Sequence, residues 1–277
     1  MADEGTSPFR RPKTWMLVVA ALVAVGTGVG VWLGASGPAG GGTPATARQL
    51  VRASLADARA AGSFHYVSSS ISSSATTSNV SQVTDGDAAS QSGRQVITLS
   101  GDTFDVVVAG ATAYFRGDAA AMVVNLGIPI GVAEAHARQW IALVAGEAPY
   151  QSVEVAVTTA SALDQNITFS ALEDLGSTRV DGTQTTAIEG RMRPVDGQPA
   201  RGTATLYVST SRHPLPVRYV ESGTVGSGSK ASRLRFSMTF SSWGESVGVS
   251  APAGAIPFTS LGASGGGPPS PGPTILT

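Results

Sequence analysis

Few side chains in this sequence have the types and the spacing that enzyme chemistry requires. The chain has 3 histidines, His65, His136 and His213, which lie far apart in the sequence, and it has no cysteine. A hydrolase of the Ser–His type would hold one of these histidines within hydrogen-bonding reach of a serine in a cleft, but with 33 serines such a pairing has no specificity. The acidic pair Glu173 and Asp174 is interpreted as a solvated turn. The sequence therefore predicts a protein that is not an enzyme.

Motifs for metals and cofactors are not found in the sequence either. There is no G-x-S-x-G turn, and no two histidines stand at the i, i+3 or i, i+4 spacing of a helical metal site. The glycine-rich runs do not follow a strand and open a helix, as phosphate-binding loops do. We expect no cofactor and no metal.

Charge is scarce along the chain. Lys and Arg number 18, Asp and Glu number 19, and charged residues make up 13% of the sequence, with a net charge of −1. Because a nucleic-acid-binding protein needs a basic surface against the phosphates, we expect no nucleic-acid partner. The lack of cysteine excludes disulfides, thiolate zinc sites and the lipidated cysteine of a bacterial lipoprotein. An apolar content of 42% is sufficient for a folded core.

An uncharged apolar run near the N-terminus predicts a membrane-spanning helix. Residues 15–33 carry no charge, and a helix of this length, at about 1.5 Å per residue, covers roughly 28 Å, close to the hydrocarbon thickness of a bilayer. Arg10, Arg11 and Lys13 precede the run, and the next basic residue is Arg48. The positive-inside rule then predicts a single-pass protein of the cell membrane, with its N-terminus in the cytoplasm and the rest outside. The alternative is a cleaved signal peptide, for which this run is too long.

The rest of the chain divides by composition. Residues 1–14 are the expected cytoplasmic N-terminus, and the Gly-, Pro- and Ala-rich residues 34–47 are typical of a flexible linker. Residues 262–277 have the Gly/Pro-rich composition of a disordered tail. The segment 48–261 between them has a suitable length for one extracytoplasmic domain.

Hydrophobic periodicity predicts that this domain is α+β. A helix is expected at its start, where Leu50, Val51 and Leu55 recur at helical spacing and Gly62 ends the pattern. The same spacing indicates helices over 118–126 and 132–141, while 148–162 is ambiguous between helix and strand. Alternation with period two predicts strands over residues 64–73, 94–100, 103–108, 113–116, 184–191, 204–209, 215–221 and 233–240. This order implies a large antiparallel sheet with helices gathered on one face, and we expect the many Ser and Thr residues to hydrate its outer face.

Apolar residues of the central helical block are candidates for a ligand-binding cavity. They either pack the helices onto the sheet as ordinary core, or line a cavity that a curved sheet closed by helices can enclose. The strand over 233–240 presents further apolar side chains on one face. The candidate ligand-binding residues are Met122, Val123, Leu126, Ile128, Trp140, Phe236 and Met238.

Several phrases in order along residues 48–258 resemble the LolA-like lipoprotein-carrier fold, and within it the LppX/LprG-type envelope lipoproteins of actinobacteria. The phrases are AYFRG at 113–117, QWIAL at 139–143, VDGTQT at 180–185, LYV at 206–208 followed by PLPVR at 214–218, and FSSWGE at 240–245. The resemblance implies a half-barrel of antiparallel strands wrapped over helices, with an apolar cavity that accepts the acyl chains of lipids or glycolipids. The chain departs from the family because the lipobox cysteine is missing, and because Tyr207 stands where relatives often carry Trp.

The leading expectation is a membrane-anchored, non-enzymatic protein that binds or transfers a lipid, glycolipid or other apolar ligand outside the cytoplasm. The alternative is an envelope scaffold or sensor module, with a core filled by its own side chains, that binds proteins rather than lipid. The packing of the interior distinguishes the two.

Overall fold

The computed structural model describes residues 43–74, 79–147, 149–154, 157–195, 197–228 and 231–262. The predicted membrane helix over 15–33, residues 34–42 of the predicted linker and residues 263–277 of the predicted tail lie outside the described residues. Within the described ranges, no helix is both long and apolar enough to cross a membrane.

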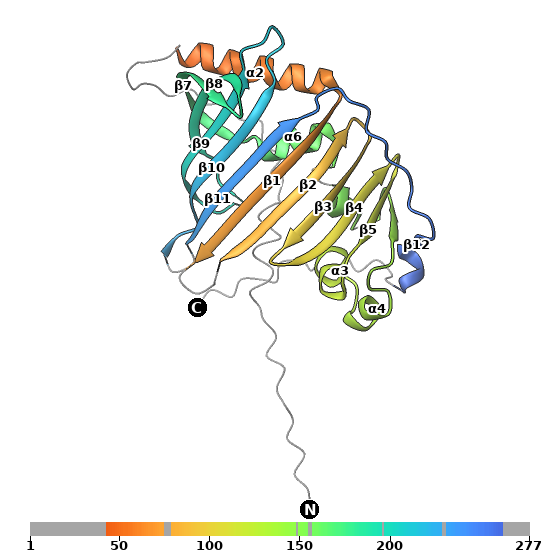
Figure 1. Ribbon diagram of the computed structural model, residues 1–277. Coiled ribbons are helices and arrows are strands. Elements are labelled where there is room, and N and C mark those ends of the chain that lie inside the picture. Colours follow the sequence, from red (N-terminus) through yellow and green to blue (C-terminus); the bar gives the residue numbers. More distant parts are fainter. Residues whose placement is uncertain are drawn as a thin grey trace, which may run out of the picture.

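One sheet of 12 strands forms the framework of the domain (Figure 1). Its order is β12-β6-β5-β4-β3-β2-β1-β11-β10-β9-β8-β7, and every pairing is antiparallel except that of β12 with β6. Two meanders, β1 to β6 and β7 to β11, therefore meet where β1 pairs with β11. The strands are β1 (Ser63–Ser74), β2 (Val80–Ala89), β3 (Ser92–Leu99), β4 (Asp102–Ala109), β5 (Thr112–Arg116), β6 (Ile141–Val144), β7 (Phe169–Val180), β8 (Thr183–Met192), β9 (Ala200–Ser209), β10 (Pro216–Val225), β11 (Ser232–Ser241) and β12 (Ile256–Pro257).

The strands predicted from alternation are present in the structure. In β11 the apolar side chains alternate with polar ones as expected, and Met238 and Phe240 are buried. The turn between β7 and β8 is formed by Asp181 and Gly182, whose φ angles are 48° and 81°. Positive φ at both central residues matches the twist of a two-residue hairpin, and glycine adopts it without steric cost.

The first helix begins inside the segment that composition assigns to a linker. α2 (Pro44–Ala61) is capped by Thr43, whose side chain accepts a hydrogen bond from the backbone N–H of Thr46. Proline at the first helical position supports this start, because its missing N–H has no helical partner to lose. Residues 44–47 therefore belong to α2, which corrects the boundary of the predicted linker. Gly62 ends the helix with a φ of 77°, as expected.

The central block contains shorter helices than predicted. The predicted helix over 118–126 is confirmed as α3 (Ala119–Leu126), which Asp118 caps. The prediction over 132–141 is wrong at its end, because α4 (Ile130–Ala135) stops early and Ile141 begins β6, fully buried against β5. The ambiguous segment 148–162 contains α5 (Tyr150–Glu154) and the start of α6 (Thr159–Asn166).

The two long strands β2 and β7 were not predicted from the sequence. β2 contains a glycine and two aspartates, and β7 contains Glu173 and Asp174, so neither shows clean alternation. The interpretation of Glu173 and Asp174 as a solvated turn is therefore wrong. β7 is the last strand of the sheet, and an edge strand tolerates carboxylates because one of its sides remains open to solvent.

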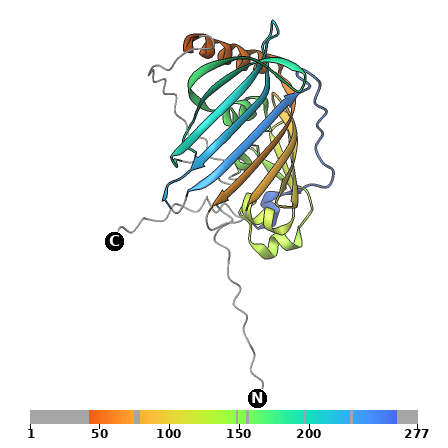
Figure 2. The ribbon, with the colours of Figure 1, turned by 60° about the vertical axis from the view of Figure 1, so that its left-hand side comes forward.

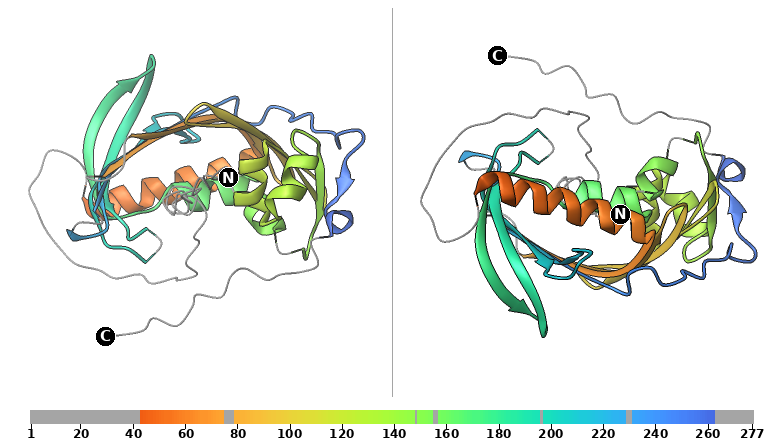
Figure 3. Two further views of the ribbon diagram at one scale, coloured as in Figure 1. Left: turned by 90° about the horizontal axis from the view of Figure 1, so that it is seen from below. Right: turned by 90° about the horizontal axis from the view of Figure 1, so that it is seen from above.

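The helices pack on the concave face of the sheet and bury two apolar clusters (Figure 3). The first cluster lies between α2, α6 and strands β1 and β8–β11, and Figure 2 shows α2 across one end of the sheet. The second lies between α3, α4, α5, the 3-10 helix η3 (Phe258–Leu261) and strands β3–β6. The sheet is thus shared by two cores.

Strand β1 reverses the expectation that Ser and Thr hydrate the outer face. Phe64 and Tyr66 point into the first cluster, so alternation directs Ser68, Ser70 and Ser72 to the same concave face. We call these three the serine row; they are half-buried. On the convex face, β1 instead exposes Val67 and Ile71, with exposed fractions of 40% and 46%. Along this part of the strand the concave face carries serines, and the convex face carries Val67 and Ile71 together with Ser69 and Ser73.

A C-terminal strap, residues 242–262, connects the two cores. Near its start, Trp243 packs on the ring of Phe64 with centroids 4.7 Å apart, and the N–H of Gly244 donates to the carbonyl of Ser63 at 2.9 Å. At its end, η3 is buried in the second cluster. The strap therefore ties the middle of the sheet to its β6 edge.

Candidate functional site

The concave face of β10 and β11, together with the start of β7, carries a patch of large apolar side chains that is not fully covered. We call Phe169, Leu172, Val225, Leu234 and Phe236 the concave patch; all are half-buried and pack against the first cluster. Cross-strand pairing aligns this face with the serine row, because Phe236 lies opposite Ser70 and Leu234 opposite Ser72. The patch is therefore apolar on one side and bordered by hydroxyl groups on the other.

Tyr219 and Glu221 form the polar centre of the concave patch. The ring of Tyr219 is fully buried, with its centroid 5.7 Å from that of Phe169 and 6.2 Å from that of Phe236. Its hydroxyl oxygen lies 2.5 Å from Oε1 of Glu221 and 3.1 Å from the carbonyl oxygen of Thr168. Burial raises the pKa of Glu221, more than the hydrogen bond with Tyr219 lowers it. Burial and the neighbouring carboxylate also raise the pKa of Tyr219 far above its usual range.

The residues predicted to bind a ligand do not form one group. Met122, Leu126 and Ile128 are buried in the second cluster, and Val123 packs against it. Their side chains fill the space between α3 and the sheet, which is the ordinary-core alternative.

The other predicted residues lie in two further places. Met238 is buried in the first cluster, and Phe236 belongs to the concave patch beside it. Trp140 is half-buried, and the guanidinium of Arg116 lies over its ring, 4.5 Å from the centroid. Arg116 pairs with Asp105 at the convex face. Of the predicted set, Phe236 is the large side chain that the concave patch presents to solvent, and ligand contact by the others stays a prediction.

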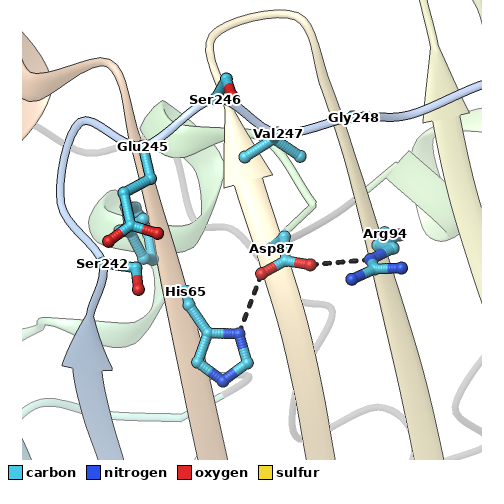
Figure 4. A pocket seen from close by; sticks show the side chains of 9 residues that line it. His65, Asp87, Arg94, Ser242, Glu245, Ser246, Val247 and Gly248 are labelled. Carbon is cyan, nitrogen blue, oxygen red and sulfur yellow. Dashed lines mark hydrogen bonds and ion pairs between the residues drawn. The ribbon is translucent and has the colours of Figure 1, made fainter.

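A second candidate site is a polar pocket of about 310 Å³ that lies between the strap and strands β1–β3 (Figure 4). Nδ1 of His65 lies 2.9 Å from Oδ1 of Asp87, and Nε of Arg94 donates to Oδ2 of Asp87 at 2.7 Å. Burial raises the pKa of Asp87, but the hydrogen bonds from His65 and Arg94 outweigh it, so that the pKa is lowered overall. Ser242 and Glu245 also line the pocket.

This pocket lacks the geometry of a catalytic site. Within the described residues, no hydrogen bond joins a histidine ring to a serine hydroxyl, so His65 and Asp87 have no nucleophile placed for activation. Nor do the described residues contain a group of acidic and histidine side chains that could hold a metal ion. The arrangement is an ion-paired surface depression.

Sequence reasoning missed Tyr219 and Glu221. The strand that contains them was predicted, and both residues fall on the same face of it because they are two positions apart. A glutamate on a strand face that also carries a buried aromatic residue is a usable signal in a chain with so few charges. The hydrogen bond between Tyr219 and Thr168, which are 51 residues apart, is set by the fold and has no sequence signature.

Comparisons with known proteins give similarity in structure but not in sequence. No family model matches the chain, and no curated protein does. Among solved structures, lipoprotein LppX of Mycobacterium tuberculosis is similar with a TM-score of 0.44 and 16% identity, over 75% of this chain and 100% of that chain. LprF of Mycobacterium bovis has a TM-score of 0.43 and 16% identity, over 78% and 100%. A LolA superfamily protein of Nitrosomonas europaea has a TM-score of 0.25 and 12% identity, over 70% and 92%.

These structures are of the LolA-like and LppX/LprG type that the sequence phrases resemble. At such low identities and TM-scores, the similarity concerns the fold alone and says nothing about a ligand.

Proposed function

We propose that this chain is a non-enzymatic protein, held in the membrane by residues 15–33, whose extracytoplasmic domain binds or transfers a lipid or other apolar ligand. The observation that carries the proposal is the concave patch, where Leu234 and Phe236 remain partly exposed beside a filled cluster. Covering apolar surface contributes about 25 cal/mol for each Å² removed from water. An acyl chain laid along the patch is the simplest ligand that would cover it without polar groups of its own.

The energetics suit exchange with a bilayer. A lipid that moves from the membrane to the patch leaves one hydrocarbon environment for another, so the gain of about 0.8 kcal/mol per CH₂ from water largely cancels. Loading and release are then close to thermoneutral. Polar groups beside the patch decide which lipid is held, and the membrane segment keeps the domain within reach of the bilayer.

A second candidate function, protein binding by a scaffold or sensor module, is favoured by a different face. The residues of both clusters are buried, and the convex face of β1, β2 and β3 exposes apolar side chains that a partner could cover. These are Val67, Ile71, Val83 and Val96, with exposed fractions between 40% and 46%. The two candidates therefore use opposite faces of the sheet.

Photo-crosslinking of the full chain in lipid nanodiscs separates them. The discs contain a trace of diacylglycerol with a diazirine in one acyl chain, and labelled peptides are identified by mass spectrometry after irradiation. We expect label on peptides of β10 and β11, reduced severalfold by Leu234→Ser on the concave patch and unchanged by Val96→Ser on the convex face. Label confined to residues 15–33, or equal loss in the two variants, would overturn lipid binding on the concave face.

The proposed topology has its own test, because the chain has no cysteine of its own. A single cysteine at Ser90, which is exposed between β2 and β3, is expected to react with a membrane-impermeant maleimide in intact cells. A single cysteine at Ser7 is expected to react only after the cells are lysed. The reverse pattern contradicts the topology.

A further inference from the structure

Among the described residues, the carboxyl group of the concave patch has no counter-ion. Glu221 lies on β10 opposite Phe236 and is half-buried. Arg235 on β11 pairs with Ser222, the next residue of β10, so alternation places its side chain on the convex face. Arg201 on β9 pairs with Thr224 and faces the same way. Within the described residues, Glu221 has no ion pair.

The contacts of the Tyr219 hydroxyl favour a protonated Glu221. The Tyr219 oxygen is within hydrogen-bonding distance of Oε1 of Glu221, at 2.5 Å, and of the Thr168 carbonyl, at 3.1 Å. Tyr219 has one hydroxyl proton and a carbonyl has none. The Tyr219 hydroxyl is placed to donate to either acceptor, and its one proton satisfies one of them fully. Both contacts are full hydrogen bonds at once if Glu221 is protonated, because the carboxylic acid then donates to Tyr219 and Tyr219 donates to Thr168. The burial that raises the pKa of Glu221 acts in the same direction.

The second carboxyl oxygen, Oε2, then remains as a neutral acceptor. Within the described residues, Oε2 receives no hydrogen bond. The side-chain atom of these residues that is both fully buried and without a partner is Oγ of Ser54, so Oε2 is not fully buried. Oε2 therefore reaches space that a ligand can enter. A neutral carbonyl oxygen beside apolar side chains accepts a hydrogen bond from a hydroxyl group, and it repels a phosphate or carboxylate, which brings acceptors and negative charge.

We propose that Glu221, held in place by Tyr219, is the headgroup contact of the concave patch and selects lipids that present a hydroxyl group and no negative charge. This inference rests on the proposed lipid-binding function and adds the class of lipid to it. Diacylglycerols and glycolipids belong to this class, and phosphatidic acid does not.

The test compares three probes with identical photoreactive acyl chains in nanodiscs that carry the full chain. One is a 1,2-diacylglycerol, one is its 3-O-acetyl ester, which has no hydroxyl, and one is phosphatidic acid. All three start from the same bilayer, so differences in label on peptides of β10 and β11 report the headgroup contact. Since a hydrogen bond between neutral groups changes affinity by roughly three- to tenfold, we expect diacylglycerol to label that much more than its acetyl ester and phosphatidic acid to label least.

Two variants assign the preference to the carboxyl group. Glu221→Leu is expected to abolish the advantage of diacylglycerol while labelling by the acetyl ester persists. Glu173→Leu, which removes an exposed carboxyl group on β7, is expected to leave the order unchanged, and thermal unfolding of each variant confirms that it is folded. Equal labelling by the three probes, or a preference that survives Glu221→Leu, overturns the headgroup contact while leaving lipid binding intact. No label from any probe on these strands overturns the proposed function itself.

Discussion

A substitution at Gly86 tests which side chains of β1 and β2 point to the concave face, because Gly86 lies beside the buried ring of Tyr66. Tyr66 lies opposite Gly86 in the sheet, and a Cβ added at Gly86 would lie 2.6 Å from Cζ of Tyr66 and 2.7 Å from its hydroxyl oxygen. Tyr66 is 2% exposed, and its hydroxyl donates to Oε1 of Gln95 at 2.9 Å. Gly86→Ala therefore forces a buried ring to move and leaves the backbone conformation unstrained, because Gly86 has no positive φ.

The cost has two parts. Overpacking a buried site by one methyl group costs about 1–3 kcal/mol. Displacing the Tyr66 hydroxyl from Gln95, itself 7% exposed, weakens a buried hydrogen bond, which contributes about 0.5–1.5 kcal/mol. We expect Gly86→Ala to lower the free energy of unfolding by about 2–4 kcal/mol. For a domain of this size the unfolding temperature then falls by about 5–15 °C.

Urea and thermal unfolding of the full chain measure this change, with Gly131→Ala as the matched control. Gly131 lies in α4 with nothing near its missing Cβ, so the helix gains about 0.5–1 kcal/mol from alanine. In the background of Tyr66→Leu, Gly86→Ala is expected to cost at least about 1 kcal/mol less, because the clashing ring is gone. If Gly86→Ala is as stable as the wild type, or if its cost is the same with leucine at position 66, then the ring of Tyr66 does not cover Gly86 and the inward facing of β1 is wrong.

Three further outcomes follow from contacts at the strap, the pocket and the patch. Trp243→Ala removes the ring contacts with Phe64 and Phe240 and is expected to lower stability by about 2–3 kcal/mol, measured by thermal unfolding. An unchanged unfolding temperature would show that the strap is not anchored there. Asp87 has a lowered pKa, so its carboxylate stabilises the fold at neutral pH. This stabilisation is lost as pH falls below the ordinary value of 3.8. Asp87→Asn should therefore cost about 1 kcal/mol or less at pH 7 and nothing at pH 2.5, in urea titrations at the two pH values. Glu221 has a raised pKa, so folding favours its protonated form. Stability is then lost as pH rises above the ordinary value of 4.5. Glu221→Gln should unfold at a higher temperature than the wild type at pH 8 but not at pH 4, and a constant difference would contradict the raised pKa.

Local sequence patterns were sufficient to predict many strands of the sheet. β11 alternates cleanly because one face of it packs on a core and the other does not, and Asp181–Gly182 marks a turn because glycine accepts a positive φ. Residues at helical spacing likewise gave α2 and α3. In each of these cases, the residues whose types mark the element lie within a few positions of one another along the chain, even where the partners of that element are distant, as they are for β11.

The rest depends on contacts between distant segments. β2 has two aspartates and a glycine, and it is a strand because the glycine accommodates Tyr66 and because β1 and β3 supply its hydrogen bonds on both sides. Ile141 continues a helical pattern, but pairing with Phe115 of β5 makes it the start of a strand. The division of the predicted ligand residues between two clusters follows from the order of the strands, which no local pattern shows.

The serine row explains why the two clusters are unequal candidates for the proposed ligand. An acyl chain on Leu234 and Phe236 would have to cross Ser70 and Ser72, and then β2, to reach Met122. Crossing buries hydroxyl groups that the hydrocarbon cannot satisfy, and each unsatisfied hydroxyl costs about 1–3 kcal/mol. That cost exceeds what one or two additional CH₂ groups return. We therefore expect the proposed ligand to stay on the side of the sheet formed by β7–β11, where Glu221 lies, and the second cluster to hold the other half of the sheet in shape.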